Sequence, residues 1–297
     1  MAIVNEKAGT VVSGDLDAEG LRAMFAEAGV EADVRFLPGD QICDTAREAV
    51  TGGADAVVAG GGDGTIRAVA SVLAGGKVPM GVLPLGTLNH FARDLGIPTD
   101  PAGAVGLIAK GQVKALDLGD VNGEVFVNNS VLGFYPPVVK VRDWERRKLD
   151  RNKWLATASA ALKVLPKLPT LRLHVKAEGV DAWRNTHFAF IGNNEYQMNA
   201  FSFGARNRFD SGDLYVYIAR TSSRLGLFGL ALLSLIRDVT RTRGFDSWEL
   251  PELTVETRHK KALAVYLDGE VTVLTPPLRY TTRPLALPVI VPAAPPA

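Results

Sequence analysis

Apolar and polar residues follow two different patterns along the chain, and the first extends to about residue 115. Here short apolar runs are separated by segments in which apolar residues recur at helical spacing, the pattern of a parallel sheet covered by helices. Leu21, Met24, Phe25 and Ala28, for example, fall at i, i+3, i+4 and i+7. We expect strands over residues 2–4, 34–37, 55–59 and 80–83, and helices around residues 21–28, 42–50 and 66–73, the first capped by Asp15 or Asp17.

The second pattern begins after residue 113 and is that of half-buried strands. Apolar residues alternate with polar ones around residues 171–175, and Asn122-Gly123 supplies the positive φ angles of a two-residue hairpin turn. Helical segments over residues 138–164 and 224–240 interrupt the strands, and prolines exclude a helix in the tail. We therefore predict an α/β plus all-β chain, with a Rossmann-like three-layer domain over residues 1–115, an antiparallel β-sandwich over 116–275, and a segment 276–297 that packs back on the first domain and frays at its end.

Composition and charge narrow the functional classes. The chain has 297 residues and a formal net charge of +1, which argues against binding nucleic acid through bulk positive charge. Its single cysteine, Cys43, excludes an internal disulfide and a cysteine-based metal site. The N-terminus lacks the basic start and apolar core of a signal peptide, and the longest apolar run, residues 225–236, is shorter than the roughly 20 residues of a spanning helix. We expect a cytoplasmic protein.

A glycine-rich turn lies between a predicted buried strand and the following helix, at Gly60-Gly61-Gly62-Asp63-Gly64-Thr65. Glycines let backbone N–H groups approach an anion, and a helix N-terminus adds a favourable dipole, so a phosphate chain fits there. Asp63 suits a shared Mg²⁺ ion, since hard cations bridge carboxylates and phosphates. The alternative is a tight strand-to-helix turn with Asp63 as its cap.

Two other strand ends carry loops of the same kind. One is Pro84-Leu85-Gly86-Thr87-Leu88-Asn89, and the other is Asn5-Glu6-Lys7-Ala8-Gly9-Thr10. Because the carboxyl ends of parallel strands open onto one crevice, we expect the three loops to form one site. A Walker A loop is excluded, because Gly14 is followed by Asp15-Leu16 rather than by Lys-Ser/Thr.

Two carboxylates flank a glycine far along the chain, in Leu267-Asp268-Gly269-Glu270. Strand alternation would place Asp268 and Glu270 on the same side, where one accepts a proton from a hydroxyl and the other orients a metal or a nearby cation. The alternative is a hairpin turn, because Asp-Gly is a common turn dipeptide. From these residues alone, the turn is favoured by roughly two to one.

Taken in order, residues 61–65, 84–93 and 267–270 resemble the motifs of the diacylglycerol kinase catalytic domain family, which includes bacterial lipid kinases, sphingosine kinases and ceramide kinases. The resemblance implies an ATP- and Mg²⁺-dependent kinase that phosphorylates a lipid hydroxyl in a cleft between an α/β domain and a β-sandwich. It implies Asp268 or Glu270 as the general base and leaves the choice open. It also implies that Asp63 meets Mg²⁺ through phosphate or water. The implied nucleotide contacts are Asn5, Gly9, Gly61, Gly62, Asp63, Gly64, Thr65, Thr87 and Asn89.

Three positions depart from the usual pattern of that family. His90 stands where the family usually has Asp, which removes a carboxylate from a network toward Mg²⁺. Arg67 replaces a small polar residue and adds a positive charge that we expect to meet phosphate directly. Ser211 replaces one carboxylate of the family's structural metal segment. A second ion would then be held by the Arg208 carbonyl, Asp210 and Asp213.

Two segments suggest how such an enzyme meets a lipid. Residues 140–153 carry seven basic and three acidic residues beside Trp144 and Trp154, a mixture that suits an anionic bilayer and, equally, a solvated helix. Residues 225–233 are apolar nearly all round and either cover the core, the favoured interpretation, or line an acyl-chain pocket. We therefore expect peripheral contact with a membrane that contains the lipid substrate. Whether the protein forms a homodimer is left open by the sequence.

Two other functions share part of this pattern. An NAD kinase also carries Gly-Gly-Asp-Gly, and Asn194-Glu195 matches its ribose-binding pair, although that pair lies about 130 residues after Asp63. A nucleotide- or lipid-binding regulator without turnover is the second alternative, kept open by His90 and Ser211. The acceptor is open among diacylglycerol, ceramide, sphingoid bases and related lipids.

Overall fold

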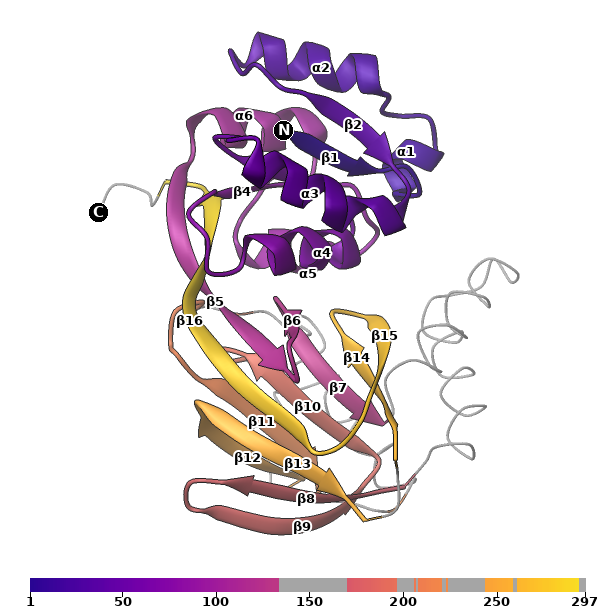
Figure 1. Ribbon diagram of the computed structural model, residues 1–297, viewed down its shortest axis with the longest axis vertical. Helices are drawn as coiled ribbons and strands as arrows, with labels where there is room; N and C mark the ends of the chain where they lie inside the picture. The colour runs from indigo at the N-terminus through magenta and orange to yellow at the C-terminus, as the bar shows by residue number, and fades with distance from the viewer. Residues whose placement is uncertain are drawn as a thin grey trace.

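The first part of the chain forms a parallel sheet with the strand order β2-β1-β3-β4 (Figure 1). The computed structural model describes residues 1–133, 170–196, 206, 208–220, 223, 244–258 and 261–293. Strand β3 begins two residues later than predicted and continues through Gly60 and Gly61. A Cβ at Gly60 would lie 2.8 Å from Val4 Cγ2, so the missing side chain lets β1 and β3 pack closely. The strands are β1 (Ala2–Asn5), β2 (Val34–Leu37), β3 (Val57–Gly61) and β4 (Met80–Pro84).

Helices cover both faces of this sheet and make three layers with it. On one face α2 (Ala18–Glu27) packs with α6 (Pro101–Lys110), and on the other α3 (Ile42–Thr51) packs with α4 (Asp63–Leu73). Asp17 caps α2, because its carboxylate accepts a hydrogen bond from Gly20 N at 2.7 Å. Shorter helical turns are α1 (Gly9–Val12), the 3₁₀ turn η1 (Gly39–Gln41) and α5 (His90–Asp94). The predicted α/β layer structure is confirmed.

The remaining strands belong to two sheets that pack face to face in the second half, one of which continues the parallel sheet through the pairing of β16 with β4. Sheet B has the order β12-β11-β10-β7-β14-β15, and the facing sheet contains β13, β8 and β9 next to β16 and β5. One core joins them, with Leu173 and Tyr280 from one sheet and Ile191, Val216 and Val265 from the other. The predicted antiparallel sandwich is therefore confirmed. Its strands are β5 (Gln112–Val121), β6 (Glu124–Phe126), β7 (Asn129–Gly133), β8 (Leu171–Ala177), β9 (Val180–Thr186), β10 (Phe188–Asn193), β11 (Leu214–Ala219), β12 (Phe245–Leu250), β13 (Glu252–Thr257), β14 (Leu263–Leu267), β15 (Glu270–Leu274) and β16 (Leu278–Val291).

Strand β16 connects the two halves of the molecule. It begins beside β13 and ends parallel to β4, with Val289 opposite Met80, while β5 runs antiparallel beside it (Figure 1). The pairing with β5 shifts register between Arg283 and Leu287. Pro284 lies in that interval, as expected for a residue that has no N–H to donate to a ladder. The proline-rich end of the chain is thus largely a strand, and it contacts the first domain through β4.

Two further predictions concern the connections. The hairpin at Asn122-Gly123 is confirmed: it joins β5 to β6, and its residues have φ angles of 54° and 90°. The predicted helices over residues 138–164 and 224–240 lie outside the described residues, as do the basic segment 140–153 and the apolar segment 225–233. In the described residues, helices are too short or too polar to cross a bilayer.

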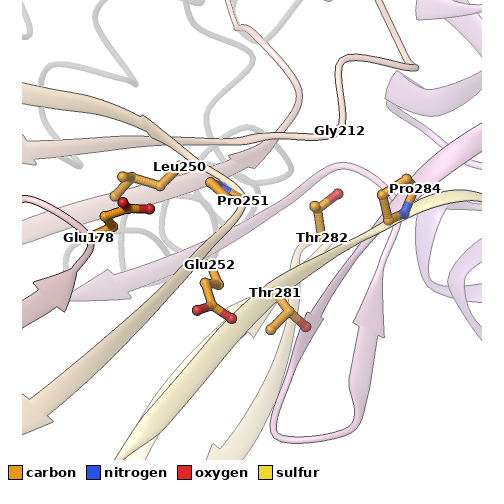
Figure 2. A pocket seen from close by; sticks show the side chains of 8 residues that line it. All are labelled: Glu178, Gly212, Leu250, Pro251, Glu252, Thr281, Thr282 and Pro284. Atoms are coloured by element: carbon orange, nitrogen blue, oxygen red, sulfur yellow. The ribbon is translucent and has the colours of Figure 1, made fainter.

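A hollow of about 410 Å³ opens on the sandwich, among the β8–β9 turn, the β12–β13 turn and β16 (Figure 2). None of the residues predicted to contact nucleotide, metal or acceptor lines it, so the candidate site lies elsewhere. The lining residues are Glu178, Gly212, Leu250, Pro251, Glu252, Thr281, Thr282 and Pro284.

Candidate active site

The loops after β1, β3 and β4 meet at the carboxyl edge of the parallel sheet. Asn5 Nδ2, at the end of β1, donates a hydrogen bond to Thr65 Oγ1 at 3.2 Å. Leu85 N, after β4, donates to Gly61 O at 3.0 Å. The chain crosses from one side of the sheet to the other between β1 and β3, and ligands of such folds bind at this switch point. The structure therefore brings the three glycine-containing loops together.

Close backbone packing explains the glycines in two of these loops. A Cβ at Gly86 would lie 2.5 Å from Gly62 Cα, and a Cβ at Gly61 would overlap the Thr65 side chain. Gly62 is the N-cap of α4, with extended backbone and no side-chain cap. The first N–H groups of α4 therefore face the loops without a side-chain acceptor from the N-cap, which is the arrangement that binds phosphate oxygens.

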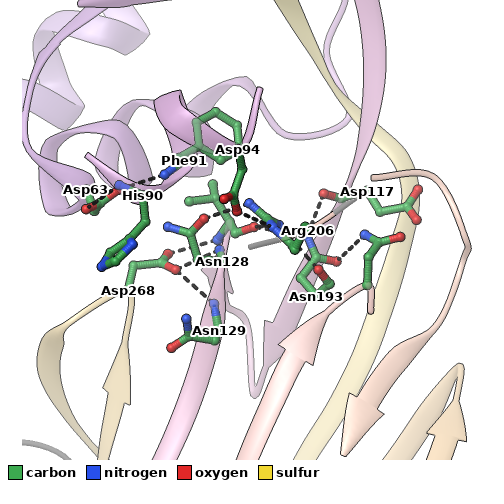
Figure 3. Close-up of polar contacts among 12 residues, drawn as sticks. Asp63, His90, Phe91, Asp94, Asp117, Asn128, Asn129, Asn193, Arg206 and Asp268 are labelled. Atoms are coloured by element: carbon green, nitrogen blue, oxygen red, sulfur yellow. Dashed lines mark hydrogen bonds and ion pairs between the residues drawn. The ribbon is translucent and has the colours of Figure 1, made fainter. Parts of the chain in front are cut away.

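Asp63 is the first residue of α4, and its carboxylate caps a different helix. Its oxygens accept hydrogen bonds from the backbone N–H groups of His90 at 3.3 Å and Phe91 at 3.2 Å, at the start of α5 (Figure 3). These N–H groups would otherwise lack partners within α5. Asp63 therefore caps a helix, as the alternative interpretation expected. The helix that it caps is α5, however, and not α4, whose N-cap is Gly62. The contact needs only a backbone N–H from position 90, so a histidine serves there as well as an aspartate.

Asn89 shapes the loop that precedes α5. It has a left-handed φ of 50°, and its Oδ1 accepts a hydrogen bond from Gly86 N at 3.0 Å. Its Nδ2 donates to Pro84 O at 3.0 Å and Gly86 O at 2.9 Å. The side-chain amide is therefore occupied within its own loop. Thr87 lies exposed in that loop, and Gly9 lies near Leu85 O.

Asp268 lies in the turn between β14 and β15, which is the favoured of the two interpretations. Asp268 and Gly269 have φ angles of 51° and 89°, as in a two-residue hairpin turn. Alternation therefore does not place Asp268 and Glu270 side by side. The turn interpretation is right, because positive φ is most readily adopted by glycine and tolerated by aspartate.

The Asp268 carboxylate is buried against the backbone between β6 and β7. It accepts hydrogen bonds from Val127 N at 2.8 Å, Asn128 N at 2.7 Å and Asn129 N at 3.1 Å (Figure 3). Burial raises the pKa of Asp268 to about 6, against the opposing effect of these three donors and of the Arg67 charge. A carboxyl group that titrates near neutral pH is typical of functional sites.

Glu270 is exposed and contacts the glycine-rich loop of the other half. A Cβ at Gly64 would overlap the Glu270 carboxylate at Oε1. The side chain from the β14–β15 hairpin therefore lies directly against the first turn of α4. Glu270 thus brings a carboxylate of the sandwich to the start of α4, and a helix N-terminus favours a carboxylate at this position.

Arg67 does not project toward a phosphate, which corrects a second expectation. Its Nε donates to Val125 O at 2.8 Å and its Nη2 pairs with Glu124 at 2.8 Å. Because α4 carries Arg67 and β6 carries both partners, these contacts join the two halves. The competing carboxylate of Glu124 explains why the positive charge turns toward the sandwich.

Arg206 is a buried residue that the sequence analysis missed. Its guanidinium pairs with Asp94 at 3.0 Å and donates to Val127 O and to Asn128 Oδ1, each at 2.7 Å (Figure 3). Burial raises the pKa of the Asp94 carboxyl, and the Arg206 charge opposes that effect. No spacing or motif around Arg206 distinguishes it from an exposed arginine, so only the tertiary structure shows it.

The predicted second metal segment is held by other contacts. Asp210 pairs with Lys114 at 3.2 Å and approaches Arg208 Nε at 4.0 Å. Ser211 donates from its N and Oγ to Asn194 Oδ1, at 2.8 and 2.7 Å. Burial raises the pKa of Asp213. In the described ranges, no three or more His, Cys, Asp or Glu side chains are grouped to hold a metal ion. The predicted second ion, held by the Arg208 carbonyl, Asp210 and Asp213, involves only two such side chains and stays a prediction.

Asn194 and Glu195 directly follow β10, a strand of sheet B. Asn194 is fully buried, and its Oδ1 accepts both hydrogen bonds from Ser211. Its amide oxygen thus joins the end of β10 to the segment before β11, so Asn194 is engaged within the sandwich.

Comparison with known proteins gives concordant results. Residues 1–121 match the diacylglycerol kinase catalytic domain. Over 295 residues the chain is 34% identical to a "probable lipid kinase YegS-like" protein of Pseudomonas aeruginosa (strain PAO1), an alignment that covers 96% of this chain and 92% of that protein. A protein of the same name from Pseudomonas fluorescens is 32% identical, with 83% and 80% covered.

A crystal structure from Bacillus anthracis str. Sterne, described as a "putative diacylglycerol kinase", has the same fold. It superposes with a TM-score of 0.74 at 21% identity, covering 98% of this chain and 96% of that one. A structure described as a diacylglycerol kinase from the same strain gives a TM-score of 0.68 at 20% identity. These two likenesses extend over both halves of the molecule.

Proposed function

Because the chain belongs to the diacylglycerol kinase catalytic domain family and is a lipid kinase, we propose that it transfers the γ-phosphoryl group of ATP, with Mg²⁺, to the hydroxyl of a membrane lipid. The observation that carries this proposal is the contact of Glu270 with Gly64. It brings a carboxylate of the sandwich to the loop that suits a phosphate chain. Candidate acceptors are diacylglycerol, ceramide, sphingoid bases and related lipids.

The glycine loops are the proposed nucleotide site. Phosphoryl transfer builds charge on the γ-phosphoryl oxygens, so catalysis depends mainly on positioning and on neutralising that charge. The backbone N–H groups at the start of α4, and the loops that contain Gly62 and Gly86, supply preorganised donors for this purpose. Asn5 and Thr65 join two of the loops through their hydrogen bond and keep the site in register.

Asp63 fits the proposed role toward Mg²⁺. Its two oxygens accept one backbone N–H each, and a carboxylate has about four acceptor positions, so both oxygens can still bind a cation or its water. When bound beside phosphate, Mg²⁺ supplies charge neutralisation and orientation. Asp63 would hold it from the α4 side.

Of the two acceptor-side carboxylates, Glu270 is the proposed general base. Geometry comes before pKa in choosing a base. Glu270 is exposed and lies against the phosphate loop, whereas the oxygens of Asp268 already accept three N–H groups and are buried. The raised pKa of Asp268 favours that residue instead. However, a hydroxyl can reach Glu270 without displacing any hydrogen bond that holds Asp268, so we assign Asp268 to hold the turn.

The proposal of a lipid acceptor is supported by the composition of one face of sheet B, the face that points away from the sandwich core. Residues on this face alternate with core residues and form an aromatic cluster that includes Phe190, Tyr196, Tyr217 and Tyr266. Tyr266 lies two residues before Asp268, so this largely buried aromatic cluster adjoins the acceptor carboxylates. We propose that the enzyme binds the bilayer peripherally to reach its substrate.

The experiment is a transfer assay with γ-labelled ATP. The purified protein is incubated with vesicles that contain one candidate lipid each, and with NAD in a separate reaction, with Mg²⁺ and with a chelator. Label in one lipid that requires Mg²⁺ supports the proposal. Label in NAD would replace it with the NAD kinase function, and ATP binding without any labelled product would replace it with the regulator function.

A further inference from the structure

Arg206 occupies the boundary between the two halves, and its side chain is fully buried. Its Nε contacts Asp94 of α5, in the α/β half, at 3.0 Å. Its Nη1 donates to Val127 O, and its Nη2 donates to Asn128 Oδ1, in the sandwich half. We propose that Arg206 is a positioning residue that sets the acceptor-side carboxylate Asp268 relative to the nucleotide-side carboxylate Asp63.

On the sandwich side, Arg206 and Asp268 hold opposite ends of one peptide group. Val127 O accepts from Arg206 Nη1 at 2.7 Å, and the N–H of the same peptide, Asn128 N, donates to Asp268 Oδ1 at 2.7 Å. A cation on the carbonyl polarises the peptide and fixes its plane, which makes its N–H a stronger and better-oriented donor. Arg206 therefore controls the donor that places Asp268, without touching Asp268 itself.

On the α/β side, Arg206 acts through the five-residue helix α5. Asp94, the last residue of α5, pairs with Arg206 Nε, while His90 N and Phe91 N, at its start, donate to Asp63. The Phe91 ring also lies 5.8 Å from the guanidinium. A shift of α5 would move the donors that hold Asp63. One guanidinium thus fixes the supports of both carboxylates (Figure 3).

The charge at this place is poorly explained as a stabilising device. A buried ion pair often adds little stability over apolar residues of the same size, because desolvation offsets the attraction. The surroundings are otherwise suited to an apolar side chain, since the rings of Phe91, Tyr196 and Phe209 surround the guanidinium. What an apolar residue would not supply is directed donors to Asp94, Val127 and Asn128 at once, which the fork of an arginine provides.

The proposal rests on the proposed kinase function, and its test uses a variant that avoids leaving a buried charge unpaired. In Arg206→Met/Asp94→Asn the guanidinium and the carboxylate charge are removed together. We expect kcat for lipid phosphorylation to fall at least about tenfold, because small displacements of reacting groups are costly. KM for ATP should change by less than about twofold, since the glycine loops are untouched. Arg206→Lys, which restores a charge and one donor, should recover part of kcat.

Arg184→Met is the control for the loss of an ion-paired arginine away from the site; its side chain is 33% exposed, and its partner Asp246 is buried. Arg184 pairs with Asp246 at 2.5 Å in the sandwich, and Asp246 keeps a second arginine, Arg220, at 2.8 Å. This variant should lower the melting temperature and leave kcat as in the wild type. Amide hydrogen exchange is the second readout. The N–H groups of Asn128 and Asn129 should exchange faster in Arg206→Met/Asp94→Asn than in wild type and in the control.

Each outcome decides the proposal. A kcat within twofold of wild type in the folded double variant overturns it, as does a loss of melting temperature with no change in kcat. If the double variant does not fold, Arg206→Lys decides, and a wild-type kcat in that variant overturns the proposal. If the wild type phosphorylates no lipid, the kinase proposal has failed on its own. Hydrogen exchange at Asn128 and Asn129 then decides whether Arg206 orders this peptide, and unchanged exchange overturns the inference.

Discussion

Each half of the molecule holds one carboxylate through hydrogen bonds from backbone N–H groups, but the two carboxylates are buried to different degrees. In the α/β half, Asp63 is partly exposed and accepts two backbone N–H groups at the start of α5. In the sandwich half, Asp268 is buried and accepts three N–H groups of consecutive residues. Burial raises the pKa of Asp268 to about 6, so the same kind of support yields a carboxyl group that titrates near neutral pH.

The difference lies in what each carboxylate can reach. Asp63 keeps access to the glycine loops, which suits it to a cation beside phosphate. Asp268 is enclosed, and the residue that reaches outward from its hairpin is Glu270, which touches Gly64. Backbone N–H donors therefore orient Asp63 itself toward the glycine loops, whereas at Asp268 they fix the hairpin turn from which Glu270 reaches those loops.

Replacing Glu270 tests the presenting member of the sandwich half and has the largest expected effect. We expect Glu270→Gln to lower kcat by about 10² to 10⁴, the usual contribution of a general base, with an unchanged melting temperature because the side chain is exposed. Initial rates of lipid phosphorylation measure this. Glu252→Gln, an exposed carboxylate on β13, is the control. A rate near that of wild type in Glu270→Gln would return the role of base to Asp268.

Replacing Asp63 tests the presenting member of the α/β half. Asp63→Asn keeps the size of the side chain and removes the charge that attracts Mg²⁺, so we expect a fall of about 10²-fold in rate at fixed Mg²⁺. Titrating Mg²⁺ in the transfer assay should recover part of the loss. Asp44→Asn removes an exposed carboxylate that pairs with Arg47 on α3 and should leave the rate unchanged. Equal rates in both variants would show that Asp63 only caps α5.

Replacing Asp268 tests whether burial, which distinguishes this carboxyl group from that of Asp63, raises its pKa. Its pKa is raised from the ordinary 3.8 to about 6, so its contribution to stability is fully present below pH 3.8 and is lost as pH rises through about 6. The free energy of unfolding should therefore fall between pH 4 and pH 7 by up to about 3 kcal/mol from this group. Urea unfolding at the two pH values measures the fall. In Asp268→Asn it should be smaller by that amount; an identical fall would contradict a raised pKa.

Replacing Gly64 tests the contact between the halves and has the smallest expected effect. A Cβ there would overlap the Glu270 carboxylate, whose flexible side chain must then move away, and we expect Gly64→Ala to lower kcat by about tenfold. Gly106→Ala is the matched control, because a Cβ at this position in α6 meets nothing within 4 Å. It should keep the rate and raise stability slightly, as alanine favours a helix. If the two alanine variants have the same rate, the Glu270 contact is not needed for transfer.

The α/β half was the more predictable of the two, for a reason that its hydrogen bonds illustrate. Asp63 contacts residues 27 and 28 positions away, within a strand–helix–strand pattern whose strand ends meet by topology. Asp268 contacts residues 139 to 141 positions away. The motif around Asp268 was recognisable in the sequence, and the hairpin turn was correctly favoured. Its hydrogen-bond partners at residues 127–129 could not be predicted, because they are backbone N–H groups, which every residue except proline has.

Charged side chains were the least predictable features. The positive charge of Arg67 suggested a phosphate contact, yet Glu124 and Val125 O bind it from β6. Arg206 drew no prediction, although its charged side chain is fully buried. A sequence gives the charge of an arginine but not the acceptors that surround it, since these come from other elements.

The sequence by itself determined the alternation of strands and helices in the first half, the strand-rich second half, and the loops in which glycine, aspartate and glutamate carry the proposed chemistry. Those features depend on apolar periodicity and on backbone φ, which are properties of neighbouring residues. Only the tertiary structure decided that Asp63 caps α5, that Asp268 is enclosed while Glu270 reaches Gly64, and that Arg206 joins their supports. These depend on burial and on donors from distant elements, which exist only once the two halves pack together.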